Sequence, residues 1–238
     1  FELFEGNSFD ATLSPEINFV VSELFGNDPF QEGVLPTLKN IAKHLNQNEN
    51  VKYFPKKLSV YFEFIQLNEH HAKHRIHWEK AAHLGEQNES YKNFYNHFVG
   101  KAYDILDLKS ASFALNLTAR NFKKVSNTVC LGTLPLDPPK HYGRREHPLK
   151  GKKELSLDVQ AENICGLIWF RVVIDEGSTI SSHPQESDAC DHWSPLILPM
   201  VNIQIPFAEK IDISYSLNEE ENQFHCSLYS KDKLIAKR

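Results

Sequence analysis

Several features that would assign this chain to a common class of protein are missing from its sequence. No run of apolar residues approaches the roughly 20 that a membrane-spanning helix needs. The four cysteines are scattered without a C-x-x-C pair, which argues against a zinc site or a disulfide framework. No secretory signal peptide is recognisable. The mild net charge of -5 argues against a dedicated nucleic-acid-binding protein. We therefore expect a protein of a reducing compartment, with no membrane partner, that is cytoplasmic or, in a eukaryote, nuclear.

What is present is the composition of a folded globular protein. The 238 residues are enough for one large domain or two modest ones, and 41% of them are hydrophobic. The chain opens at Phe1, without methionine and directly in an alternating, strand-like pattern over residues 1–4. Because a natural protein rarely begins inside a strand, we expect a fragment or a processed product.

The first quarter of the chain holds its most informative stretch. Residues 17–21 have the pattern of a short buried strand, and residues 35–45 repeat apolar side chains every three to four positions, which predicts an amphipathic helix. Between them lie Glu23 and Glu32, separated by a turn-forming Gly-Asn-Asp-Pro sequence. Ligands of open α/β sheets bind just beyond the carboxyl ends of strands, so both carboxylates can converge on one cation. A solvated acidic loop is the alternative.

Short β-strands dominate the rest of the chain. Residues 58–67 are rich in aromatic and β-branched side chains, and eight further candidate strands follow residue 110, with turn residues between them. Such spacing is typical of an antiparallel barrel or sandwich. The candidates are 111–118, 128–131, 154–160, 165–174, 194–205, 210–217, 223–230 and 233–236.

A histidine-rich stretch follows residue 68. Some of its histidines have the i,i+4 and i,i+3 spacing of ligands on a helix, which can hold a metal ion. No cysteine or acidic residue completes an evident ligand set, so we interpret the stretch as a solvated helical face and expect no metal site. The histidines are His70, His71, His74, His77, His83 and His97.

A proline-rich, basic segment spans residues 136–153. We predict a solvent-facing loop for this segment. The alternative is a surface that accepts acidic substrates or nucleic acid. Its basic residues are Lys140, Arg144, Arg145, Lys150, Lys152 and Lys153.

The loop that carries the two glutamates resembles the double-glutamate loop of the protein arginine N-methyltransferases. That loop has a Ser-Glu pair, a nearby glycine and a second glutamate nine positions after the first. Here Ser22, Glu23, Gly26 and Glu32 match these positions.

A second motif of the same family is matched far along the chain. Its barrel strand of the type Gly-Leu-x-x-Trp/Phe-Phe resembles the sequence that begins at Gly166, and its serine-rich segment resembles Ser-Ser-His-Pro from residue 181. Its Thr-His-Trp loop, which faces the double-glutamate loop in the family, is similar to Asp191-His192-Trp193, with aspartate in place of threonine. The resemblance covers nearly the whole chain.

This resemblance implies an α+β fold. Residues 1–55 are expected to be the remnant of a Rossmann-like methyltransferase sheet, and residues 56–238 an antiparallel β-barrel that binds the substrate. An inserted helical arm over about 68–104, with Ile76-His77-Trp78, implies homodimerisation of the full-length protein. The family holds S-adenosyl-L-methionine in a glycine-rich loop, but no GxGxG sequence occurs here. The cofactor-binding residues are therefore unknown, and this chain alone is expected to be inactive.

The resemblance also implies a function, the transfer of a methyl group from S-adenosylmethionine to an arginine nitrogen of a protein substrate. Glu23 and Glu32 are the expected catalytic clamp, because carboxylates pair bidentately with the planar guanidinium. His192 is expected to shape the pocket as a third catalytic residue, and Trp193 to contact the substrate or pack its loop onto the barrel. The alternative is a non-catalytic interaction module of the same fold. Methyl transfer to another nucleophile is a third hypothesis.

Overall fold

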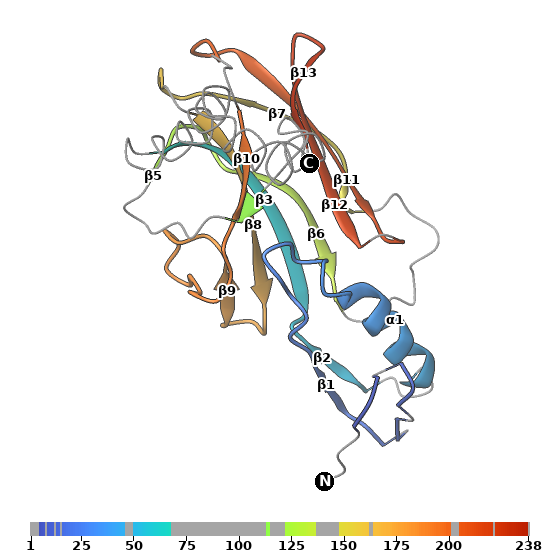
Figure 1. The fold of residues 1–238 in the computed structure, drawn as a ribbon. Helices are drawn as coiled ribbons and strands as arrows, with labels where there is room; N and C mark the ends of the chain where they lie inside the picture. Colours follow the sequence, from blue (N-terminus) through green and yellow to red (C-terminus); the bar gives the residue numbers. More distant parts are fainter. Residues whose placement is uncertain are drawn as a thin grey trace, which may run out of the picture.

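The computed structural model describes most of the chain outside the predicted helical arm (Figure 1). The predicted strand at 1–4, the arm at about 68–104 and the six histidines between 70 and 97 lie outside the described residues. In the described part, no helix is long and apolar enough to cross a membrane. The described residues are 5–7, 9–11, 13–14, 16–45, 50–67, 113–114, 122–136, 148–161, 164–200, 205–220 and 222–237.

A small β–α–β unit comes first in the described part. Strand β1 (Phe19–Val21) pairs in parallel with β2 (Lys52–Phe54), and helix α1 (Val34–Leu45) connects them. Parallel neighbours need such a crossover, because a tight turn would reverse the chain direction. The helix confirms the predicted apolar period, whereas β2 was not predicted because three residues are too few to show a period. The buried residues of α1 are Val34, Leu35, Leu38 and Leu45.

The largest sheet contains seven strands within the described segments, and all of its pairs are antiparallel. Its path runs β4-β10-β8-β3-β5, with β6 also paired to β3 and β9 to β8. The central strands β3 and β8 pair from Lys57 with Val173 to Gln66 with Ile164. The bounds are β3 Lys57–Leu67, β4 Phe113–Ala114, β5 Phe122–Lys124, β6 Val129–Pro135, β8 Ile164–Val173, β9 Thr179–Ser181 and β10 Leu196–Pro199.

A second antiparallel sheet has the strand order β13-β12-β11-β7. Together the two sheets curve around a shared core and form a half-barrel (Figure 1). Alternate residues of β3, from Leu58 to Phe64, point into this core. The antiparallel class that the strand spacing predicted is therefore confirmed. The bounds are β7 Lys150–Ser156, β11 Lys210–Asn218, β12 Gln223–Ser230 and β13 Lys233–Lys237.

The other face of the largest sheet is also apolar. Trp169 of β8 packs there with Ile65 of β3, whereas its neighbour Phe170 faces the main core. Because successive residues of a strand point to opposite faces, the continuous apolar run in β8 reflects burial on both sides.

The predicted basic loop at 136–153 is wrong at its C-terminal end. Strand β7 begins at Lys150 and also contains Lys152 and Lys153. It is the edge strand of its sheet, where exposed lysines are compatible with strand pairing. Residues 137–147 lie outside the described part of the chain. Strands β5 and β9 were not predicted, since short strands carry little periodic signal. The prediction of a strand over 194–205 is too long, because β10 spans only Leu196–Pro199.

Candidate functional site

The loop between β1 and α1 is built from consecutive tight turns. The Ser22 N–H donates to the carbonyl of Phe54 at 3.0 Å, which extends the parallel pairing by one bond. The Asp28 carboxylate accepts a hydrogen bond from the Phe30 N–H at 3.0 Å and so closes a local turn. Gly33 ends the loop with φ at 75°, a conformation that favours glycine. The backbone between Glu23 and Glu32 is thus folded back on itself, as its turn-forming residues predicted.

Two buried aromatic rings anchor this loop on the half-barrel. Phe25 packs 6.2 Å from the ring of Phe170 and meets the ring of Trp193 edge-on at 5.9 Å. Phe30 is fully buried and lies 6.3 Å from the ring of Phe224 in β12. Aromatic side chains contribute large buried areas, so these contacts fix the loop firmly.

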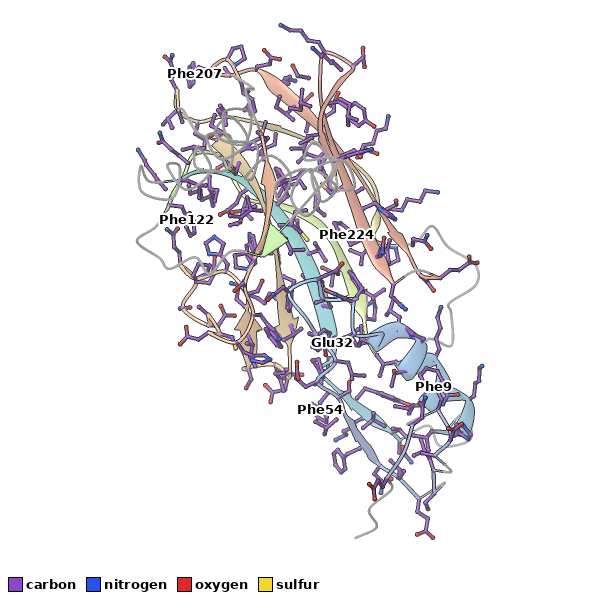
Figure 2. The ribbon with its side chains drawn as sticks, viewed as in Figure 1. Phe9, Glu32, Phe54, Phe122, Phe207 and Phe224 are labelled. Carbon is purple, nitrogen blue, oxygen red and sulfur yellow. The ribbon has the colours of Figure 1, made fainter. Side chains whose placement is uncertain are left out.

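Glu23 and Glu32 are exposed while the rings between them are buried. The Glu32 carboxylate folds back over the loop, and its Oε1 lies 3.3 Å from the point where a β-carbon on Gly26 would sit. Figure 2 shows Glu32 between α1 and the half-barrel. Within the described residues, neither carboxylate takes part in an ion pair. Both remain accessible to a cationic side chain.

The second predicted motif lies against the same loop. The side-chain oxygen of Asn27 accepts a hydrogen bond from the Ser194 N–H at 2.7 Å, next to the contact between Phe25 and Trp193. Trp193 is 7% exposed and also packs 5.0 Å from the ring of Phe170. Its Nε1 is buried without a hydrogen-bond partner in the described residues. The fold therefore brings together two motifs that lie far apart in the sequence.

His192, in the second motif, is exposed. Its backbone N–H donates to the Cys190 Sγ at 3.4 Å, and its ring lies 6.3 Å from that of Trp193. The His192 ring thus lies on the surface of its loop, whereas the Trp193 ring is buried against Phe25 and Phe170. A contact of either side chain with a substrate stays a prediction.

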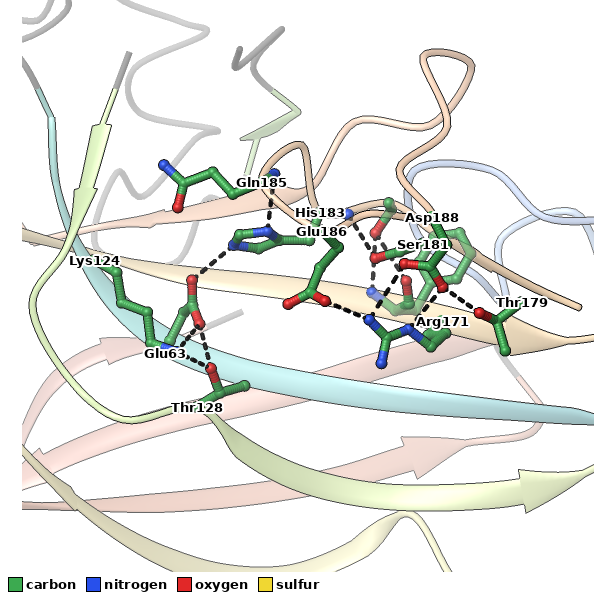
Figure 3. Close-up of polar contacts among 12 residues, drawn as sticks. Glu63, Lys124, Thr128, Arg171, Thr179, Ser181, His183, Gln185, Glu186 and Asp188 are labelled. Carbon is green, nitrogen blue, oxygen red and sulfur yellow. Dashed lines mark hydrogen bonds and ion pairs between the residues drawn. The ribbon is translucent and has the colours of Figure 1, made fainter. Parts of the chain in front are cut away.

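A buried polar cluster that the sequence did not predict lies on the other face of the sheet (Figure 3). The His183 Nε2 is 2.8 Å from Oε1 of Glu63, and both side chains are almost fully buried. Thr128 donates to Glu63 at 2.6 Å, and the Lys124 ammonium lies 3.4 Å away. Because the Gln185 N–H donates to Nδ1 of His183, the proton of the neutral ring is on Nε2. Both ring nitrogens are engaged, so His183 is unavailable as a general base.

Arg171 of β8 holds the segment after β9. Its guanidinium contacts Glu186 at 2.6 Å and Asp188 at 3.0 Å (Figure 3). Burial lowers the pKa of Arg171, but the two carboxylates outweigh this effect and raise the pKa above its usual value. These ion pairs and the His183 contact brace the segment that leads to His192.

The described residues can also be assessed as ligands for a metal ion or a cofactor. No group of three histidine, cysteine or acidic side chains could hold a metal ion in the part of the chain described. The carboxyl end of β1 leads into Ser22 and Glu23 rather than into a glycine-rich turn, and that of β2 leads into Pro55, which lacks an N–H. Neither strand end is followed by the glycine-rich loop that is expected to hold S-adenosylmethionine, so none of the described residues is assigned to that molecule.

Comparisons with known proteins agree on the fold. No protein-family model and no curated protein matches the chain significantly. Arabidopsis thaliana protein arginine methyltransferase 10, solved in a uniquely open conformation, aligns with a TM-score of 0.65 and 14% identity, over 100% of this chain and 74% of that one. Trypanosoma brucei PRMT1, an enzyme–prozyme heterotetrameric complex with AdoHcy, aligns with a TM-score of 0.59 and 17% identity, over 95% of this chain and 67% of that one. These alignments confirm the family resemblance at the level of the fold: the chain has the fold of the protein arginine methyltransferases.

Proposed function

We propose that this chain forms the arginine-binding part of a protein arginine methyltransferase. The observation that carries the proposal is the docking of the glutamate loop against the Trp193 loop, through Asn27 and Ser194 and through Phe25. Each motif alone is short, but both match one family and they meet in one place. The shared fold supports the same assignment.

The chemistry of the proposed site follows from charge and shape. A guanidinium is planar and permanently charged, and it presents parallel N–H donors that fit carboxylates. Glu23 and Glu32 are exposed on one folded loop and unpaired within the described residues, so they can bind it from two sides. Their role is to orient one nitrogen and to stabilise its charge, which are the main demands of a displacement reaction. In this proposal the exposed His192 shapes the pocket, and the buried Trp193 packs the loop that carries both residues onto the half-barrel.

S-adenosylmethionine supplies the methyl group in this class of reaction. The similar T. brucei structure contains AdoHcy, which is S-adenosylmethionine without its transferred methyl group, and this supports S-adenosylmethionine as the cofactor of the protein to which this chain belongs. None of the described residues is assigned to that molecule, so we limit the proposal to binding and orientation of the arginine.

The test is methyl transfer by the complete gene product from labelled S-adenosylmethionine to an arginine-rich peptide. Glu23→Gln and Glu32→Gln should each lower kcat/KM by about 100-fold or more, on the order of 3 kcal/mol, since each removes one charged partner of the guanidinium. Glu176→Gln is the matched control, because Glu176 is an exposed glutamate in the turn after β8. Equal activity of all three variants would show that the two glutamates do not form the clamp.

A non-catalytic interaction module is the second candidate. One similar structure is an enzyme–prozyme complex, so chains of this fold also occur in a complex with a prozyme. If the complete gene product binds neither S-adenosylmethionine nor an arginine peptide but assembles with another chain, this alternative is correct. Light scattering of the gene product alone then decides whether it self-associates, as the predicted arm implies.

A further inference from the structure

The loop with the two proposed clamp residues is held to the half-barrel by a polar contact as well as by rings. The side-chain oxygen of Asn27 accepts the Ser194 N–H at 2.7 Å, across 167 positions of sequence. We propose that Asn27 is a positioning residue, which fixes the clamp loop against the segment that carries His192 and Trp193. Its effect on catalysis rests on the proposed function, whereas the contact itself does not.

The hydrogen bond and the aromatic contacts stabilise the position of the loop in different ways. Phe25 touches both Phe170 and Trp193, and such apolar contact is non-directional, so it resists separation of the loop more than sliding along the surface. A hydrogen bond weakens steeply when its angle falls away from linear. The bond from Ser194 to Asn27 therefore sets the register of the loop, while the aromatic rings supply most of the buried area.

The place of Asn27 in the loop makes this register important. It lies four residues after Glu23 and five before Glu32, so a shift at Asn27 moves both carboxylates. Productive binding of a guanidinium requires its partners to be held within about 0.5 Å. A loop that keeps its rings buried but slides by more than this distance would bind arginine less well without unfolding.

Loss of the bond should therefore appear as weaker substrate binding. A hydrogen bond of this kind favours the docked register by about fivefold, which corresponds to about 1 kcal/mol. The apparent affinity for a substrate falls in proportion to the competent fraction of the protein. Asn27→Ala should raise KM for an arginine peptide by about twofold, up to a limit of about fivefold, and leave kcat within about twofold, because bound substrate restores the docked loop.

The contact can be tested without any activity. The chain has three tryptophans, so 5-fluorotryptophan labelling gives three ¹⁹F resonances, and Trp193→Phe identifies the one in contact with Phe25. Asn27→Ala should shift or broaden the Trp193 resonance. The Trp169 resonance is the internal control and should not move, because Trp169 lies on the opposite face of the sheet. Asn27→Asp keeps an oxygen acceptor and should retain the wild-type Trp193 position.

The outcomes separate this proposal from the proposed function. A Trp193 resonance that Asn27→Ala leaves unchanged, or an equal shift at Trp169, overturns the positioning role. So does a fall of kcat at constant KM, which is the result of a smaller folded fraction. If the wild-type gene product neither binds nor methylates the peptide, the proposed function is wrong. The ¹⁹F spectra then still decide whether Asn27 fixes the loop.

Discussion

Replacing His183 by leucine should lower the free energy of unfolding by about 3 kcal/mol at pH 7. The imidazole and the Glu63 carboxylate are 3% and 1% exposed, and their contact is 2.8 Å long. The His183 ring is the buried hydrogen-bond donor to the Glu63 carboxylate. Removal of such a partner from a buried charge costs roughly 3–5 kcal/mol, because the remaining charge loses its compensation. Thr128 and Lys124 still contact Glu63, which places the expected cost at the lower end. Leucine is close to histidine in size, so the cavity contributes little.

This cost should shrink in acid, and the sign follows from the pKa of Glu63. Burial raises that pKa, but hydrogen bonds from His183 and Thr128 and the nearby charge of Lys124 lower it more, so it lies below the ordinary value. A depressed pKa contributes stability that is present above the unfolded-state pKa of about 4.3 and is lost as pH falls through the folded-state pKa. Without His183 the folded-state pKa rises. The His183→Leu variant then loses less stability than the wild type on acidification, so the difference between their free energies of unfolding becomes smaller.

Urea unfolding followed by circular dichroism at pH 7, 5.5 and 4 measures these differences. His192→Leu is the control, because His192 is exposed and should change stability by less than about 0.5 kcal/mol. Adding Glu63→Gln to His183→Leu should recover about 1–2 kcal/mol, since it removes the uncompensated charge. If His183→Leu lowers the free energy of unfolding by less than about 1 kcal/mol at pH 7, or by an amount that does not change with pH, Glu63 is not a buried carboxylate stabilised by His183.

Two further variants test the clamp loop. Gly26→Ala places a β-carbon 3.3 Å from Oε1 of Glu32, so the carboxylate must shift by a few tenths of an ångström. The free energy of unfolding should change by less than about 0.5 kcal/mol. Calorimetry should show weaker binding of an arginine peptide. Unchanged affinity would argue against Glu32 as a ligand. Phe30→Ala empties a fully buried site beside Phe224 and should cost about 3–5 kcal/mol in urea unfolding, with Phe30→Leu costing clearly less. A cost of Phe30→Ala under 1 kcal/mol would show that this ring does not anchor the loop.

Long or periodic elements of the fold could be predicted from the sequence. Helix α1 and strand β3 carry enough residues for a clear period, and both were found nearly at their bounds. The three-residue strands β2, β5 and β9 could not be predicted, because pairing with neighbouring strands, rather than local sequence preference, stabilises them. Strand β7 was misassigned since its lysines look like a loop, although an edge strand exposes them without cost.

The candidate site was predictable only in part for a similar reason. Glu23 and Glu32 stand out as carboxylates around a turn, but the bond from Ser194 to Asn27 depends on the tertiary fold. Glu63 gave a usable signal, because an acidic residue within an apolar strand requires a buried partner. Nothing in the sequence identified that partner as His183, which lies 120 positions away.

The domain boundary at residue 55 stays a prediction, and the proposed site does not follow it. The glutamate loop belongs to the β–α–β unit, yet its anchoring rings are buried in the same core as Phe170 and Phe224 of the half-barrel. An ion pair between Lys39 of α1 and Glu219, after β11, adds a second link. One unit therefore carries the carboxylates and the other determines where they lie. Recognition of arginine, if the proposal is correct, is a property of this junction, and a change on the half-barrel side can alter substrate binding without contacting the substrate.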